Sequence, residues 1–135
     1  MKDGGKPSGT DAKAAGTDGM REAAFNPETL MALVEGDREL LQELITLFVE
    51  DSQRLLKEAR QAVRTGNARE IERAAHTLKG SAGNFGAHAT CEAALRLETM
   101  GREKTLAAAD SAYATLEAEV QRLSEALTAF RNAPE

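Results

Sequence analysis

The segment Ala74–His88, AAHTLKGSAGNFGAH, joins a histidine and a lysine to an unusual run of small residues. We placed it and the residues before it on a helix at about 100° per residue, with His76 as the origin. One apolar stripe then forms on the side opposite His76, of the kind that faces a protein core; it contains Ile71, Ala74, Ala75, Leu78 and Ala82. The pattern predicts a helix over residues 68–83 whose histidine faces solvent.

Two glycines lie on the histidine side of this helix. Gly80 and Gly83 follow His76 by four and seven positions, and each costs about 1 kcal/mol relative to alanine in a helix interior. On spacing alone, an exposed histidine near Lys79 is also an ordinary feature of a helix surface. The glycines favour a functional interpretation, in which a partner must approach the imidazole closely.

Further helices are predicted on both sides of the histidine helix. Asn26 followed by Pro27 is a helix start, and Gly36 with Asp37 ends that helix and caps a longer one. The predicted helices cover about residues 27–34, 37–64, 68–83, 87–100 and 103–130, with Gly101 closing the fourth. Because the connections are short, neighbouring helices should be antiparallel. We therefore predict an all-α fold, an antiparallel up-down four-helix bundle with a short additional N-terminal helix packed over one end.

The apolar residues of the two longest predicted helices keep helical spacing. In the earlier helix they are Leu40, Leu44, Leu47, Phe48, Leu55, Ala59, Ala62 and Val63, and in the last they are Ala109, Tyr113, Leu116, Val120, Leu123, Leu127 and Phe130. The spacings of the last helix alternate four and three, which is typical of a bundle seam. We expect both sets to face the core.

Length and composition favour one helical domain with tails. The chain has 135 residues, no tryptophan and three prolines, which suits a single domain with a real core. Residues 1–24 are rich in glycine and small or charged residues, and we predict a flexible tail or linker there. Residues 25–130 are the predicted bundle, and residues 131–135 a C-terminal tail.

Charge and apolar patterning exclude several classes of partner. The formal net charge is −5, which argues against nucleic acid. No apolar run reaches bilayer length and no signal peptide is recognisable, so we expect a cytoplasmic protein without a membrane partner. The single cysteine, Cys91, excludes an intrachain disulfide and forms no metal framework, and we expect it to be a small buried residue. We predict no metal site.

An antiparallel hairpin would place a carboxylate beside the histidine. If the turn centres near Ala87, the residue level with His76 is Glu98. A carboxylate that accepts the Nδ1–H of a neutral imidazole fixes the tautomer and leaves the Nε2 lone pair free as a nucleophile. Lys79, one turn along, is placed to meet anionic oxygens, so the set suits phosphoryl transfer. Glu98 could equally be an ordinary exposed acid in the last turn of its helix.

Residues 76–87, HTLKGSAGNFGA, resemble the signature of the histidine-containing phosphotransfer (HPt) domain of bacterial and eukaryotic phosphorelays. That signature is HxLKG followed by small residues and a glycine. The segment 41–48 with Asp51, and the pair Leu97-Glu98, also resemble the family's pattern. The resemblance covers about residues 25–130.

The resemblance implies a mechanism in which a phosphoryl group passes from a receiver-domain aspartate to His76 and on to another receiver. It makes Lys79 the phosphate-stabilising cation and Glu98 the residue that orients the ring. Gly80 and Gly83 would leave room for the receiver, and Arg73 is a further candidate for partner binding. The chain would be a monomeric phosphotransfer module, not an enzyme; it would have no ATP site or cofactor of its own, and magnesium would belong to the receiver.

Two other functions stay open at this stage. The chain could be the substrate-histidine domain of a chemotaxis-type histidine kinase, a group that resembles the same motif and carries an acid at the position of Glu98. It could also be an inert adaptor bundle. His88 does not match the phosphoacceptor position, and we expect it to be a helix-start or surface residue.

Overall fold

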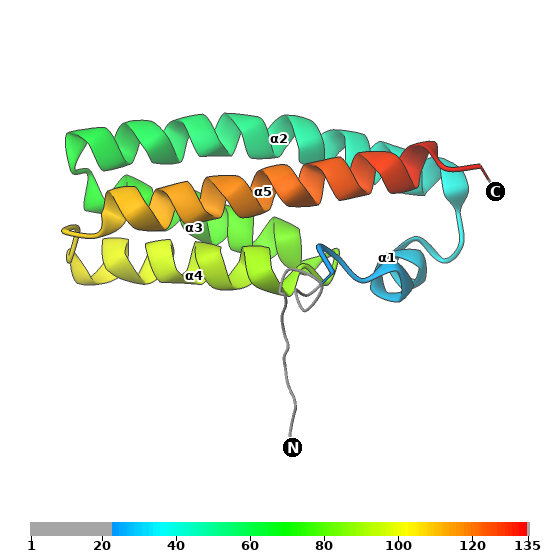
Figure 1. Ribbon diagram of the computed structural model, residues 1–135, viewed down its shortest axis with the longest axis horizontal. Helices are drawn as coiled ribbons and strands as arrows, with labels where there is room; N and C mark the ends of the chain where they lie inside the picture. The colour runs from blue at the N-terminus through cyan, green and yellow to red at the C-terminus, as the bar shows by residue number, and fades with distance from the viewer. Residues whose placement is uncertain (1–22, 135) are drawn as a thin grey trace, which may run out of the picture.

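The computed structural model describes residues 23–134, which form five helices and no strand over that range. They are α1 (Pro27–Val34), α2 (Arg38–Thr65), α3 (Ala68–Gly83), α4 (His88–Glu103) and α5 (Ala109–Asn132). Helices α2 to α5 pack in a ring in which each contacts the next and α5 returns to α2, while α1 contacts α2. Figure 1 shows α2 and α5 side by side and α1 at one end of the bundle. The predicted fold class is confirmed; residues 1–22 of the predicted tail lie outside the described range.

The helix ends follow the capping residues of the sequence. The Asn26 side chain accepts hydrogen bonds from the backbone N–H groups of Glu28 and Thr29, at 2.9 and 3.2 Å. The Asn67 side chain accepts one from Glu70 N at 3.2 Å, where α3 begins. These side chains satisfy N–H groups that have no partner within their own helix. They explain why α1 and α3 begin where the sequence predicts.

The core runs the length of the bundle between the four long helices. All five residues of the predicted α3 stripe are 0% exposed. At the α1 end, Phe48 packs edge-on against Phe85 with ring centroids 5.1 Å apart, and Phe25 packs in the same way against Phe130 at 5.4 Å. The backbone N–H of Asn26 donates to Phe85 O at 2.9 Å, so the start of α1 is tied to the turn after α3.

On the first half of α2 the sequence prediction is right for Phe48 but wrong for Leu40 and Leu47. Leu40 and Leu47 are 38% and 54% exposed, whereas Leu41, Ile45 and Phe48 are buried. The two rows lie one residue apart and both keep helical spacing, so periodicity alone does not decide between them. The row that contains Phe48 is buried because its ring meets Phe85.

The predicted boundary at Gly101 is also wrong. Helix α4 continues through Gly101 to Glu103 and is capped by Lys104 in the left-handed conformation, with φ of 59°. A Cβ at Gly101 would lie 2.7 Å from both Ala68 O and Glu72 N. Gly101 therefore allows α4 to pack closely against α3 and does not end the helix. The last helix, α5, begins at Ala109 and ends at Asn132.

Within residues 23–134 we find no helix with the length and apolar character needed to cross a membrane.

Candidate functional site

The site is built around the exposed ring of His76 on the outer face of α3. Its side chain is 67% exposed, and Nδ1 lies 2.9 Å from Oε2 of Glu98 on α4. The exposure follows from the position of His76 opposite the buried stripe of α3. Because Nδ1 is engaged by the carboxylate, Nε2 is the ring nitrogen left to react. The hairpin argument from the sequence anticipated this contact.

Glu98 is a buried acid surrounded by donors. Its side chain is 3% exposed, and both oxygens meet nitrogen atoms of neighbouring side chains. Burial by itself raises the pKa of the Glu98 carboxyl, but the hydrogen bonds and charges of Lys79 and His76 outweigh burial and hold that pKa below its usual 4.5. Glu98 is therefore ionised at neutral pH and can accept an N–H from Nδ1 of His76.

Lys79 forms an ion pair with the same carboxylate that contacts His76. Its Nζ is 2.8 Å from Glu98 Oε1, and its side chain is 31% exposed. Figure 1 shows α3 and α4, which supply these three residues, running alongside each other. The sequence prediction placed Lys79 near His76 but did not predict its ion pair with Glu98.

Arg102 completes the cluster and was missed by the sequence prediction. Its Nη2 lies 2.7 Å from Glu98 Oε2, and its Nε lies 3.2 Å from Glu72 Oε2 on α3. The spacing of four residues between Glu98 and Arg102 is a known signal for an ion pair on one helix face. That signal was lost because the helix was predicted to end before Arg102.

The two glycines beside His76 form a bare strip on α3. A Cβ built on Gly80 or on Gly83 would meet no atom within 4 Å. Both residues have exposed positions in the described structure. Nothing in the described part of the chain therefore requires glycine at either position, and alanine would favour the helix.

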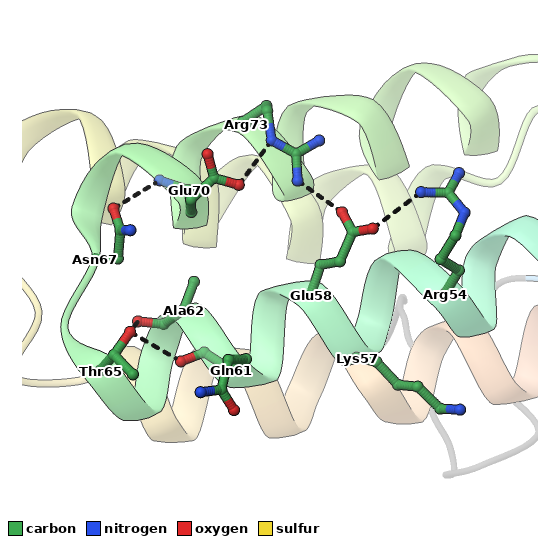
Figure 2. Close-up of a pocket in the computed structure, with 9 residues that line it drawn as sticks. All are labelled: Arg54, Lys57, Glu58, Gln61, Ala62, Thr65, Asn67, Glu70 and Arg73. Atoms are coloured by element: carbon green, nitrogen blue, oxygen red, sulfur yellow. Dashed lines mark hydrogen bonds and ion pairs between the residues drawn. The ribbon is translucent and has the colours of Figure 1, made fainter.

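Arg73 points from α3 toward α2. Its Nη2 lies 2.6 Å from Glu58 Oε1 and its Nε 2.9 Å from Glu70 Oε1. Figure 2 shows Glu58 between Arg73 and Arg54. Nη1 of Arg54 lies 3.0 Å from Oε2 of Glu58. The hydrogen bond from Arg73 is the largest influence on Glu58 and lowers the pKa of that carboxyl. A role for Arg73 in partner binding stays a prediction.

The remaining candidates of the sequence lie outside this cluster. His88 is exposed at the first position of α4. Cys91, predicted to be a small buried residue, is half-buried against the core, and burial raises the pKa of its thiol. No group of three or more potential metal ligands occurs within residues 23–134.

The α3–α4 hairpin that carries this cluster lies within the part of the chain that matches a known family. The family model described as "Hpt domain" matches residues 43–126, more than half of the chain. The chain belongs to the Hpt domain family. Among solved structures, this Hpt domain is similar to histidine-containing phosphotransfer protein B (HptB) from Pseudomonas aeruginosa PAO1. The TM-score is 0.77 at 24% sequence identity, over 83% of this chain and 97% of that chain. A search of curated proteins gave no match.

The surface around His76 of this Hpt domain is an open groove lined by side chains of both charges. Its lining on the α3–α4 face includes Arg69, Glu72, Arg73, His76, Thr77, Glu98 and Arg102. An open surface suits a reaction whose second reactant is carried by another protein, because a side chain presented by a partner can reach the ring. The ion-paired cluster of His76, Lys79, Glu98 and Arg102 thus lies on the α3–α4 hairpin.

Proposed function

We propose that this Hpt domain is a phosphorelay intermediate that accepts a phosphoryl group on Nε2 of His76. The group comes from a receiver-domain aspartate and passes to the aspartate of another receiver. In the first transfer, the P–O bond to the aspartate breaks, a P–N bond to Nε2 forms, and the aspartate leaves as a carboxylate. The second transfer reverses these changes. The observation that carries the proposal is the exposed ring of His76 held at Nδ1 by Glu98.

The tautomer explains why Nε2 is the acceptor. The ionised Glu98 accepts the Nδ1–H at 2.9 Å, so the proton stays on Nδ1 and the lone pair on Nε2 points away from the carboxylate. Phosphoryl transfer depends mainly on positioning and on charge stabilisation. Lys79, whose side chain is partly exposed, supplies positive charge for the phosphoryl oxygens.

Receiver docking would use the surface that leads from His76 toward the end of α3. Gly80 and Gly83 lack side chains there and leave the backbone open to a partner. The contact between Phe48 and Phe85 brings the first half of α2 beside the end of α3, and Leu47, adjacent to Phe48, is 54% exposed. We assign Leu47 and the two glycines to the receiver-binding surface, with Arg73 as a further contact on the α2 side.

This mechanism assigns no nucleotide or cofactor to the chain. The donor aspartyl phosphate and its magnesium ion belong to the receiver, and one Hpt monomer meets one receiver at a time in the cytoplasm. A transient interface of modest area suits such repeated exchange.

A transfer experiment tests the proposal. A purified receiver domain is phosphorylated with a small phosphodonor and mixed with this Hpt domain, and acid-labile label on the Hpt chain is measured. We expect label on the wild type and on His88→Gln, the matched histidine control, but none on His76→Gln. Label that persists on His76→Gln would overturn the assignment.

The acid at position 98 favours one alternative, a substrate-histidine domain of a chemotaxis-type kinase. In that case a kinase catalytic domain with ATP would label His76, and phosphorylated receivers would not donate to it. An inert adaptor makes a different prediction, because His76→Ala would then leave partner binding and signalling intact. Parallel assays with receivers and with a kinase domain separate the three functions.

A further inference from the structure

Lys79 and Arg102 hold opposite oxygens of the same buried carboxylate. Lys79 Nζ lies 2.8 Å from Glu98 Oε1, and Arg102 Nη2 lies 2.7 Å from Oε2, the oxygen that also contacts His76. The Glu98 side chain is 3% exposed, so water has little access to replace a donor that is lost. Two cations therefore support one ionised acid.

Lys79 has two tasks in the proposed reaction. In the unphosphorylated domain its ammonium contacts Glu98, whereas after transfer the phosphoryl oxygens on Nε2 need its charge. The side chain is 31% exposed and its four-carbon stem is flexible, so the ammonium can turn toward the surface. When it does so, Glu98 Oε1 loses its cation.

Arg102 is held in place by a second acid, Glu72, in addition to Glu98. Its Nε contacts Glu72 Oε2 on α3 at 3.2 Å while its Nη2 contacts Glu98 on α4. A guanidinium presents several donors in one plane and stays charged, so it can hold two carboxylates at once. Among the described residues that face Glu98 with a charged or titratable group, His76 and Lys79 come from α3 and Arg102 from α4, with Glu72 behind Arg102.

We propose that Arg102 is a positioning residue of phosphotransfer, which keeps Glu98 ionised and bound to His76 Nδ1 while Lys79 moves to the phosphoryl group. This inference rests on the proposed function. If Glu98 became protonated, its O–H would donate to Nδ1 and the ring proton would move to Nε2. The lone pair needed for the P–N bond would then be lost.

Nuclear magnetic resonance of the unphosphorylated protein tests the charge on Glu98. The chemical shift of the Glu98 carboxyl carbon is followed against pH in the wild type, in Arg102→Gln, in Lys79→Gln and in the double variant. Lys79→Gln imitates the state in which Lys79 has moved away, and the double variant removes Arg102 from that state. We expect Arg102→Gln to titrate near the wild type, the midpoint of Lys79→Gln to rise, and the midpoint of the double variant to rise further by about one pH unit or more. A double variant that titrates like Lys79→Gln alone would overturn the proposal.

Reaction with phosphoramidate supplies a second measurement in a folded single variant. The P–N bond of phosphoramidate breaks, a P–N bond to His76 forms, and ammonia leaves, so no receiver is needed. We expect Arg102→Gln to react severalfold more slowly at about pH 5, with a deficit that shrinks as the pH rises above about 6 and Glu98 stays ionised. Arg102→Lys should restore most of the rate.

Arg54→Gln is the matched control, because Arg54, like Arg102, pairs with an acid four residues away, but with one that is exposed. If Arg102→Gln and Arg54→Gln react alike at every pH, the role of Arg102 is wrong while the phosphoacceptor assignment stands. If the wild type is not labelled on His76, the proposed function fails, and the titration still decides whether Arg102 supports the charge of Glu98.

Discussion

Nδ1 of His76 and Oε2 of Glu98 lie 2.9 Å apart although 22 positions separate the two residues in the chain. The α3–α4 hairpin brings them together, and the buried carboxylate holds one side of an otherwise exposed ring. The ring therefore has one fixed nitrogen and one free nitrogen. The following predictions test how the structure maintains this arrangement and how a partner uses it.

Replacing Glu98 should affect stability and reactivity together. Glu98→Ala leaves Lys79 and Arg102 without their shared acceptor, and we expect a loss of about 1–3 kcal/mol in the free energy of unfolding. Glu98→Gln keeps an oxygen that can accept the Nδ1–H, so it should react with phosphoramidate faster than Glu98→Ala. Urea unfolding and labelling rates measure the two effects; equal rates for both variants would contradict the tautomer argument.

The stability contributed by Glu98 should depend on pH in one direction. The pKa of its carboxyl is lower in the folded protein than the usual 4.5, so the contribution is fully present above that value. It is lost as the pH falls through the lower folded pKa. The difference in unfolding free energy between wild type and Glu98→Gln should be constant near neutral pH and narrow below about pH 4.5. A difference that does not change with pH would show that ionised Glu98 is not responsible.

Gly101→Ala should disturb the site from a distance. The new Cβ would lie 2.7 Å from Ala68 O and Glu72 N, and these backbone atoms yield only if α3 and α4 separate. We expect a destabilisation of about 1–3 kcal/mol, measured by urea unfolding, and a weaker contact between His76 and Glu98. The contact is followed by the ring nitrogen shifts of His76, which should remain unchanged if the helices accommodate the methyl group elsewhere.

Gly80→Ala should have opposite effects on stability and on transfer. Its Cβ would meet nothing within 4 Å, and alanine is favoured over glycine in a helix, so we expect a gain of up to about 1 kcal/mol. Transfer from a phosphorylated receiver should become slower, because the methyl group lies on the bare strip assigned to docking. Reaction with phosphoramidate controls for damage to His76 and should be nearly unchanged. Unimpaired receiver transfer would remove Gly80 from the docking surface.

Leu47→Glu tests the contribution of α2 to docking. Leu47 is 54% exposed, so the fold should tolerate the change, whereas an apolar receiver contact should be weakened by about tenfold or more. Ala129→Glu is the control, since Ala129 is exposed on α5 and the described part of α5 does not contact α3. Titration of an unphosphorylated receiver measures binding; equal affinities for the two variants would exclude Leu47.

The sequence predicted the histidine helix well because several local signals agree there. Asn67 caps its start. The apolar residues up to Ala82 form a single stripe, so the side of the helix that faces the core is unambiguous. Glu98 was placed beside His76 from the hairpin geometry alone. These features depend on spacing within one short stretch of chain, which a single sequence contains.

The errors concern packing between helices, which spacing does not specify. Gly101 was interpreted as a helix end, but its role depends on the backbone of Glu72 on another helix. Leu47 and Phe48 were both predicted to face the core, but only Phe48, whose ring packs against Phe85, is buried. Arg102 could have been found from its distance of four residues to Glu98, had the helix boundary been placed correctly.

The side chains that form the ion-paired cluster of His76 and Glu98 come from residues 72–102, a single helical hairpin, whereas Leu47 lies on α2. In the proposed function the reactive cluster is therefore confined to the hairpin, and the receiver-binding surface extends beyond it onto α2. A protein engineer could therefore vary the exposed positions of α2 to redirect the domain to a new receiver and leave the coding region of the α3–α4 hairpin untouched.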